Sequence, residues 1–371
     1  MSSPTPLRFV TTLLGSGEAA AEAVRATLRK DEIDWRRVIW LASSHLILPS
    51  FTATLHRQGA FGLVPDEIGA PLDAARSLNA ERNRILRLSL KELTAQLNRI
   101  GLEPLLLKGA NALLPDAYPG AGDRMLGDLD LWLPEAAHPA ATDALLELGY
   151  RVAEESWQFM LLRDRHGHHH GTPLHHETQP VRVELHRRLV MNRADDERLA
   201  THLTTRQVEL APGVTVEVPD IATRMRHNFL HAQINDRQAR QRCLNLRQLL
   251  EFARLAETLG PGEAGKLLDG LKPRHHRRFL EYWALAEHWL GLPYPECLPR
   301  SPHQQRELSL TERVAESRAW SRGFRLYDDA LRLPRRLWGL GVRLVQAPGY
   351  FPARAKALWQ GCSTASMERW R

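Results

Sequence analysis

Residues 124–131 read Arg-Met-Leu-Gly-Asp-Leu-Asp-Leu, and the alternation in this stretch determines how the rest of the chain is interpreted. Asp128 and Asp130 alternate with Leu129 and Leu131. In a β-strand, side chains two residues apart point to the same face, so the leucines would enter a core while both carboxylates project together. Neighbouring carboxylates repel each other unless a cation lies between them. The stretch therefore predicts a strand that contributes two carboxylate ligands to a metal site.

A second alternating run, Val-Arg-Val-Glu-Leu-His at residues 181–186, offers a third carboxylate in Glu184. A few carboxylates together with phosphate oxygens suit Mg²⁺, or Mn²⁺ in its place. Alternatively, Glu184 is an outward-facing strand residue that pairs with Arg182. His186 shares a face with Glu184, where it either orients Glu184 or an acceptor, or satisfies a buried hydrogen bond.

Upstream, residues 105–110 read Leu-Leu-Leu-Lys-Gly-Ala, an apolar strand that ends at Lys108 and Gly109 before a helical pattern. Free backbone N–H groups at such a junction can bind phosphate, and Lys108 adds a point charge. The alternative is a lysine at a strand end that extends its ammonium group to water. Arg124 can bind a triphosphate in a bidentate manner, or pair with Asp128.

These stretches resemble the polymerase-β-type nucleotidyltransferase superfamily, and within it a poorly characterised bacterial family with "KG", "R…DxD" and "[DE]-x-H" elements. The resemblance extends over roughly residues 30–255 and rests on LLLKGANALLPDAYPGAGDRMLGDLDLWLP, ALLELGYRV and VRVELHRRL, with DWRRVIWLASSHLILPSF upstream and HNFLHAQINDRQARQRCLNLRQLLEFARL downstream. The superfamily usually has Gly-Ser or Gly-Gly where this chain has Lys108-Gly109, and the segment from Gly109 to Asp128 is long for the superfamily.

The resemblance implies a Mg²⁺-dependent enzyme that transfers a nucleoside monophosphate from an NTP to a hydroxyl-bearing acceptor and releases pyrophosphate. It implies that Asp128, Asp130 and Glu184 bind the metal and perform catalysis, and that Lys108, Gly109 and Arg124 bind the nucleotide. The acceptor is a small molecule, a peptide or a protein. The alternatives are an RNA- or tRNA-directed, toxin-like enzyme and a catalytically silent nucleotide-binding module.

The pattern of segments predicts an α+β fold in which a small mixed sheet is flanked by helical regions at both ends. We expect an N-terminal helical region at 1–101, including one long helix at 70–100 with Gly101 as its cap. A nucleotidyltransferase core follows at 102–219, then a helical domain at 220–290. Within the core we expect a helix at 109–114 and strands at 104–108, 127–133, 150–153, 157–162, 181–186 and 214–218. A Pro-rich break and a basic helical region occupy 291–371.

Further candidate residues lie in the segment that follows the core. His227 and His231 are one helical turn apart and could contact the acceptor or the metal ligands, or simply form a polar helix face. Further on, a basic helix surface could meet the phosphates of an acceptor; it comprises Arg237, Arg240, Arg242 and Arg247.

Two other stretches leave their role open. Residues 166–176 contain six histidines, which suggest an exposed loop more than a zinc site, because neither Cys nor an HExxH spacing accompanies them. The tail from Arg332 to Arg371 has eight Lys or Arg and one acid, with aromatic residues between them. RNA contact, a surface for protein or lipid, and packing on the core are all compatible with this pattern.

The whole chain has 371 residues, a net charge of +7 and a pI near 9.6, which favours an anionic partner such as a nucleotide or RNA. Its three cysteines form no CxxC pair, so we expect a reducing compartment, by default the cytoplasm. No apolar run reaches the length of a transmembrane helix, and the first residues do not form a convincing signal peptide.

Overall fold

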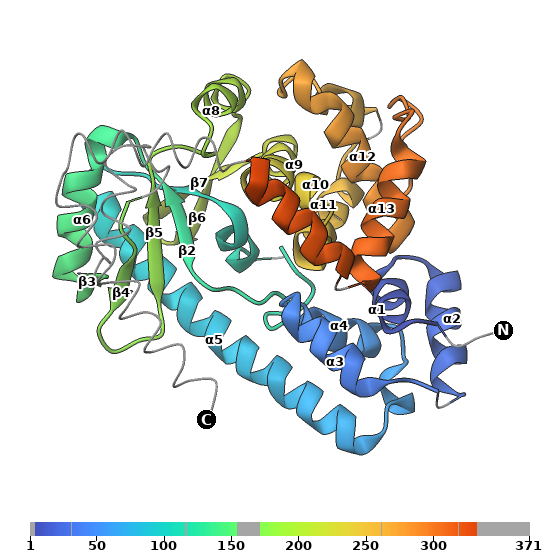
Figure 1. Ribbon diagram of the computed structural model, residues 1–371. Coiled ribbons are helices and arrows are strands. Elements are labelled where there is room, and N and C mark those ends of the chain that lie inside the picture. The colour runs from blue at the N-terminus through green and yellow to red at the C-terminus, as the bar shows by residue number, and fades with distance from the viewer. Residues whose placement is uncertain are drawn as a thin grey trace, which may run out of the picture.

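The computed structural model describes residues 4–331 except residues 31, 116, 154–170, 261 and 318. Strands occupy the middle of the chain and helices occupy both ends (Figure 1). This arrangement confirms the predicted α+β class. The expected strand at 157–162, most of the histidine-rich stretch and the basic tail lie outside the described residues.

The described strands form one mixed sheet in the order β3-β4-β5-β2-β1-β7-β6. Its centre is built from two parallel pairs, β2 with β5 and β1 with β7, joined by the antiparallel pair β1 and β2. The strands are β1 (Leu105–Leu106), β2 (Leu129–Trp132), β3 (Tyr150–Val152), β4 (Leu174–His176), β5 (Arg182–His186), β6 (Thr205–Ala211) and β7 (Val214–Pro219).

Five helices precede the sheet: α1 (Pro6–Leu14), α2 (Glu18–Leu28), α3 (Trp35–Ser44), α4 (Leu48–Arg57) and α5 (Asp66–Arg99). Within and after the sheet lie α6 (His138–Glu147), α8 (Arg193–Ala200), α9 (Ile221–Phe229), α10 (Gln238–Gln241), α11 (Leu246–Glu257), α12 (Pro273–Leu290) and α13 (Gln304–Glu316). The short helical segments are η1 (Phe61–Leu63), η2 (Lys108–Leu113), η3 (Glu135–Ala137), η4 (Leu230–Asn235) and η5 (Glu263–Leu267).

The long helix α5 matches the predicted helix and its predicted cap. Gly101 has φ +76°, and its N–H donates to the carbonyl of Asn98 while that of Leu102 donates to Leu97. This left-handed cap favours glycine because a Cβ would be strained there. The expected helix at 109–114 is instead the 3₁₀ segment η2, and strands β4 and β6 were not predicted.

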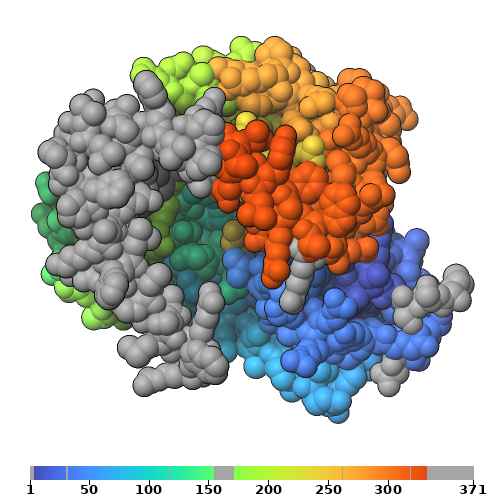
Figure 2. Space-filling model, in the orientation of Figure 1, coloured from blue at the N-terminus to red at the C-terminus, as the bar shows by residue number. Residues whose placement is uncertain are grey.

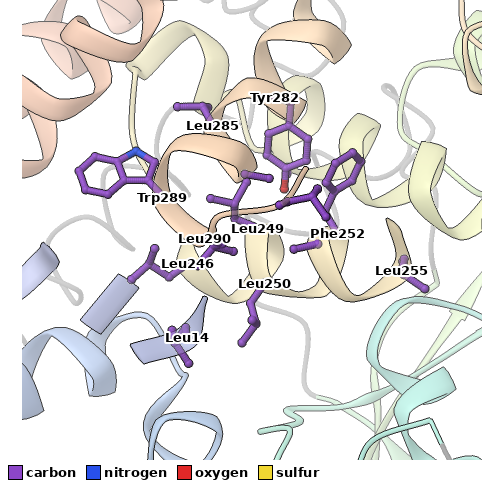
Figure 3. Close-up of a cluster of buried hydrophobic side chains, with 14 of the residues drawn as sticks. Leu14, Leu246, Leu249, Leu250, Phe252, Leu255, Tyr282, Leu285, Trp289 and Leu290 are labelled. Carbon is purple, nitrogen blue, oxygen red and sulfur yellow. The ribbon is translucent and has the colours of Figure 1, made fainter. Parts of the chain in front are cut away.

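Two hydrophobic cores organise these elements. One joins the N-terminal helices to the C-terminal helices, and Figure 3 shows part of it, with Leu14 from α1 near Leu250 of α11 and Leu290 of α12. Figure 2 shows the same two parts of the chain, blue and orange, lying against each other. The other core lies between the sheet, α6 and the second half of α5. The four-segment division into domains stays a prediction, but the first and last helical regions share one core.

No single helix among the described residues is long and apolar enough to cross a membrane. Helices α3 and α4 reach that length and hydropathy only when they are taken together, and they are bent by 120° at the break between them.

The segment between η2 and β2 is held against α5 by two buried asparagines. Asn79 Nδ2 donates to the carbonyls of Gly122 and Arg124, at 2.7 and 3.1 Å. Asn83 Nδ2 donates to Ala121 and again to Arg124, both at 2.8 Å. Because buried carbonyls need partners, these amides determine the path of the segment that leads to Arg124 and Asp128.

Asp123 adds an ionic contact in the same segment. Its buried carboxylate lies 2.8 Å from Arg57 Nη1 of α4 and 3.2 Å from Arg76 Nε of α5. Gly122 is needed beside it, since a Cβ there would lie 2.7 Å from the carbonyl oxygen of Arg76. The N-terminal helices therefore fix the loop that leads to strand β2.

We expect Asn83→Ala to lower the free energy of unfolding by about 1–3 kcal/mol, because the carbonyl of Ala121 loses its amide donor and the buried carbonyl of Arg124 keeps only Asn79. Urea unfolding monitored by circular dichroism measures this. Leu78→Ala on the same helix is the control, because Leu78 is 73% exposed and its loss changes little. Equal stability of the wild type and Asn83→Ala would show that the loop does not depend on this amide.

Candidate active site

Asp130 and Glu184 lie directly opposite each other on the parallel strands β2 and β5. Their neighbours Leu129, Leu131 and Leu185 are buried in the sheet core, as the alternation in the sequence predicts. Only 3% of Asp130 and 7% of Glu184 is exposed to solvent. Two buried carboxylates therefore lie on one face of neighbouring strands.

His186 completes this group. Its Nε2 lies 2.7 Å from Asp130 Oδ1 and 3.9 Å from Glu184 Oε2, and the residue is fully buried. One ligand atom from each of Asp130, Glu184 and His186 lies within 4.8 Å of the others, a spacing that could hold a metal ion. The structure therefore assembles three residues that the sequence analysis selected from two separate runs.

Lys108 brings a positive charge to the same carboxylate. Its Nζ lies 2.6 Å from Asp130 Oδ1 and 3.5 Å from His186 Nε2. Strand pairing places it there, since the N–H of Leu107 donates to the carbonyl of Asp130 at 3.0 Å. Lys108 itself has φ +45°, and Asn111 Nδ2 donates to its carbonyl at 3.3 Å. A lysine in the left-handed region costs roughly 1–2 kcal/mol, so the surrounding contacts must hold it.

The ion pair changes the acidity of both partners. Burial alone would raise the pKa of Asp130, but Lys108 and the hydrogen bond from His186 hold it well below its usual range. Burial likewise opposes the charge on Lys108, yet Asp130 and the other nearby carboxylates raise the pKa of its ammonium. Both groups are therefore charged at neutral pH.

Asp128 lies one residue before β2, outside the group that shares a 4.8 Å spacing. Burial, followed by the charges of Asp130 and Glu184, raises its pKa to about 6. Glu184 has a further partner in Arg182, whose Nη2 lies 2.6 Å from Oε1. Glu184 thus both faces the acidic group and forms the ion pair with Arg182 that was the alternative interpretation.

A pocket opens beside Lys108, between the sheet and the C-terminal helices. It encloses about 670 Å³ of space between atoms, part of it open to solvent. Its lining combines apolar and polar side chains: Leu107, Lys108, Asn111, Arg124, Leu189, Leu199, Pro219, Thr223, Arg224, His227, Asn228, His231, Arg247, Gln248 and Glu251. Four cationic side chains and one carboxylate in this lining give it a net positive charge.

Arg124 enters this pocket but does not pair with Asp128. Its Nη2 and Nε lie 2.8 and 3.3 Å from Glu251 Oε2, and only about a tenth of either side chain is exposed. Gly109 allows Leu126 to pack against the turn after β1, because a Cβ at Gly109 would lie 2.6 Å from Leu126 Cδ2.

The two histidines of α9 and η4 also line the pocket, with ring centroids 6.1 Å apart. His227 Nε2 is 2.9 Å from the carbonyl of Leu189, and burial, together with His231 and Lys108, lowers its pKa to about 3. His231 Nδ1 lies 3.3 Å from Asp236 Oδ2. The π-helical turn of η4 accounts for this contact, since it brings residues five apart onto one face.

Some of the expected basic helix surface is used in internal contacts. Arg237 pairs with Asp328, and Arg242 pairs with Glu307 at 2.9 Å, whereas Arg247 lines the pocket. The sequence analysis missed Arg224, Gln248 and Glu251. The latter two carry a detectable signal, because Arg247, Gln248 and Glu251 are polar residues at helical spacing on the amphipathic helix α11.

A family model described as an uncharacterised nucleotidyltransferase matches residues 31–291, well over half of the chain. The chain therefore belongs to this nucleotidyltransferase family, as the resemblance of its motifs implied. The matched range includes the N-terminal helices from α3 onward, the whole sheet and the helices that line the pocket. A search of the curated proteins finds no match.

We expect Asp130→Asn and Asp128→Asn to change stability in opposite directions when metal is chelated at pH 7.5. Asp130→Asn deprives Lys108 of its partner and should lower the free energy of unfolding by about 2–3 kcal/mol. Asp128→Asn removes a carboxylate whose charge is repelled by Asp130 and Glu184, and it should raise the free energy of unfolding by about 1–2 kcal/mol. Urea unfolding of the two isosteric variants measures both. Shifts in the same direction would contradict the assigned electrostatics.

The gain in stability that we expect for Asp128→Asn should also depend on pH. The pKa of Asp128 is raised to about 6 in the folded chain from 3.8 in a free carboxyl. Folding therefore disfavours its charged form, so the wild type loses this increment of stability as the pH rises through about 6. The advantage of the asparagine variant should be full above pH 7 and absent below pH 4. A constant difference between the two proteins across this range would rule out Asp128 as the titrating group.

Proposed function

We propose that this member of the nucleotidyltransferase family transfers a nucleoside monophosphate from an NTP to a hydroxyl-bearing acceptor and releases pyrophosphate. The observation that carries the proposal is the pairing of Asp130 and Glu184 across two parallel strands, with Asp128 just ahead of one of them. Family membership supplies the class of reaction.

The donor set fits a hard divalent cation. Asp128, Asp130 and Glu184 offer carboxylate oxygens, which Mg²⁺ and Mn²⁺ prefer, and His186 adds a nitrogen that Mn²⁺ accepts more readily. When bound, such an ion would neutralise phosphate charge and lower the pKa of the acceptor hydroxyl. Without it, the Nζ of Lys108 supplies the positive charge that Asp130 requires.

The residues of the chain then have separable roles. Lys108 is close enough to the carboxylates to bind a phosphate oxygen of a nucleotide that reaches them. Arg124, held by Glu251, presents a guanidinium to the pocket, and Gly109 leaves room for Leu126 against the turn after β1. In the transfer, the acceptor oxygen bonds to the α-phosphorus as the bond to pyrophosphate breaks, so positioning and charge neutralisation dominate over covalent chemistry by the protein.

The acceptor is best sought among small molecules, peptides and proteins that carry a hydroxyl. The pocket supports a ligand of limited size, because the apolar side chains of Leu107, Leu199 and Pro219 line it next to the cations. An RNA acceptor would draw mainly on the net charge of +7.

We expect Mg²⁺ or Mn²⁺ together with an NTP to stabilise the protein more than either does alone, because the nucleotide and the ion bind the same carboxylate face. At about 100 times the dissociation constant the gain is about 2.7 kcal/mol. Differential scanning fluorimetry with each of the four nucleotides measures it. Glu184→Gln should abolish the joint effect, whereas Glu177→Gln, an exposed carboxylate after β4, should retain it.

Pyrophosphate release and transfer of an α-³²P label to candidate acceptors complete the test. The wild type should release pyrophosphate only with a divalent ion present, and Asp130→Asn should lose at least about a hundredfold in rate. If no nucleotide raises the melting temperature in the presence of either ion, the proposed function fails.

A further inference from the structure

Most arginines of the C-terminal helices have partners inside the protein. Arg226 donates to the carbonyls of Leu267 and Lys266, at 3.0 and 2.7 Å, and Arg242 pairs with Glu307. Arg224 of α9 and Arg247 of α11 are different. Within the part of the chain that the structure describes, neither side chain forms a hydrogen bond or an ion pair, and both line the pocket beside Lys108.

This lack of partners is costly, because both groups are partly withdrawn from water. Burial lowers the pKa of each guanidinium, and the Nε of Arg247 is buried without a hydrogen-bond acceptor. An unpaired charge in such surroundings usually indicates a missing counterion.

The pocket lining supplies only a shared counterion, because the charge of Glu251 favours the charged form of both arginines without contacting either of them. Its only carboxylate among the described lining residues, Glu251, already accepts two contacts from Arg124. Asp130, which is not among the lining residues, is occupied by Lys108 and His186. Two cations therefore remain for which the described residues offer no dedicated acceptor.

We propose that Arg224 and Arg247 form a binding site for a multivalent oxyanion that enters the pocket. Arginine suits this role, because its planar donors match phosphate and carboxylate oxygens in pairs. The apolar side chains of Leu189, Leu199 and Pro219 line the same pocket and would strengthen such contacts by limiting water. The oxyanion is either the phosphate chain of the nucleotide or an acid group of the acceptor.

Which molecule carries the oxyanion depends on the proposed function, whereas the anion site itself does not depend on it. Arg247 is the nearer of the two to the carboxylate group, since the charges of Glu251, Asp128 and Asp236 all act on it, whereas Glu251 and Tyr118 but neither aspartate act on Arg224. An anion that spans Arg247 and Arg224 would thus extend away from the carboxylate group. Both a triphosphate and an elongated acidic acceptor have this shape.

The first experiment measures binding of inorganic tripolyphosphate by isothermal titration calorimetry with EDTA present, so that no metal contributes. We expect Arg224→Gln and Arg247→Gln each to weaken binding at least about tenfold, and the lysine variants to weaken it less because they keep the charge. Arg206→Gln is the matched control: Arg206 is an exposed arginine on β6 that is near enough to influence Arg224 but does not line the pocket.

Folding of the variants is checked by urea unfolding without ligand. Because Arg224 and Arg247 have no internal partner among the described residues, their glutamine variants should be at least as stable as the wild type. Equal tripolyphosphate affinity in the wild type and both variants would overturn the site, as would an equal loss in Arg206→Gln, which would indicate only a general surface charge.

A second experiment distinguishes the two sources of the oxyanion. The titration is repeated with saturating Mg²⁺ and α,β-methylene ATP. If the nucleotide excludes tripolyphosphate, the arginines bind the phosphate chain; if tripolyphosphate still binds, and still depends on both arginines, they bind the acid group of an acceptor. Glu184→Gln separates the proposed function from the proposed anion site, because this variant should lose metal-dependent nucleotide binding yet keep tripolyphosphate binding in EDTA.

Discussion

The ion pair between Lys108 and Asp130 is the interaction on which the rest of the site depends. Parallel pairing of β2 and β5 places Asp130 and Glu184 opposite each other, so the strands bring two buried acids together. Such an arrangement is unfavourable unless a cation shares it. Lys108 supplies that cation from the strained turn after β1, at 2.6 Å from Asp130. The strained turn therefore places a compensating positive charge beside the carboxylates, and strained backbone of this kind is common at functional sites.

The helices around the sheet hold this arrangement from two sides. On one side, Asn79 and Asn83 of α5 bind the carbonyls of the loop that leads to Asp128. On the other side, the first hydrophobic core joins the N-terminal helices to α9, α11 and α12, and α9 and α11 carry part of the pocket lining. Because one core supports both ends of the chain, the pocket lining should keep a fixed position relative to the carboxylates.

The sequence was sufficient to predict those site residues that follow from the alternation of apolar and polar residues along a strand. Asp130, Glu184 and His186 could be chosen because strand periodicity places them on one face, and the structure brings them together. The partners of these residues could not be chosen in the same way. Glu251 binds Arg124 from 127 residues away, and Lys108 reaches Asp130 only through the pairing of β1 with β2. Strands β4 and β6 were missed because they are stabilised by pairing with neighbours more than by their own pattern.

Charge is distributed unevenly across the pocket, and this asymmetry limits what can bind. The sheet side carries the carboxylates, with Lys108 beside Asp130, while the helical side carries Arg224 and Arg247. A ligand with separate anionic and cation-binding parts satisfies both sides at once. A metal-bound phosphate chain has this composition, because its oxygens can face arginines at one end and a divalent ion at the other. A neutral ligand would leave two guanidinium groups without acceptors, and it would therefore bind less favourably than an anion of the same size.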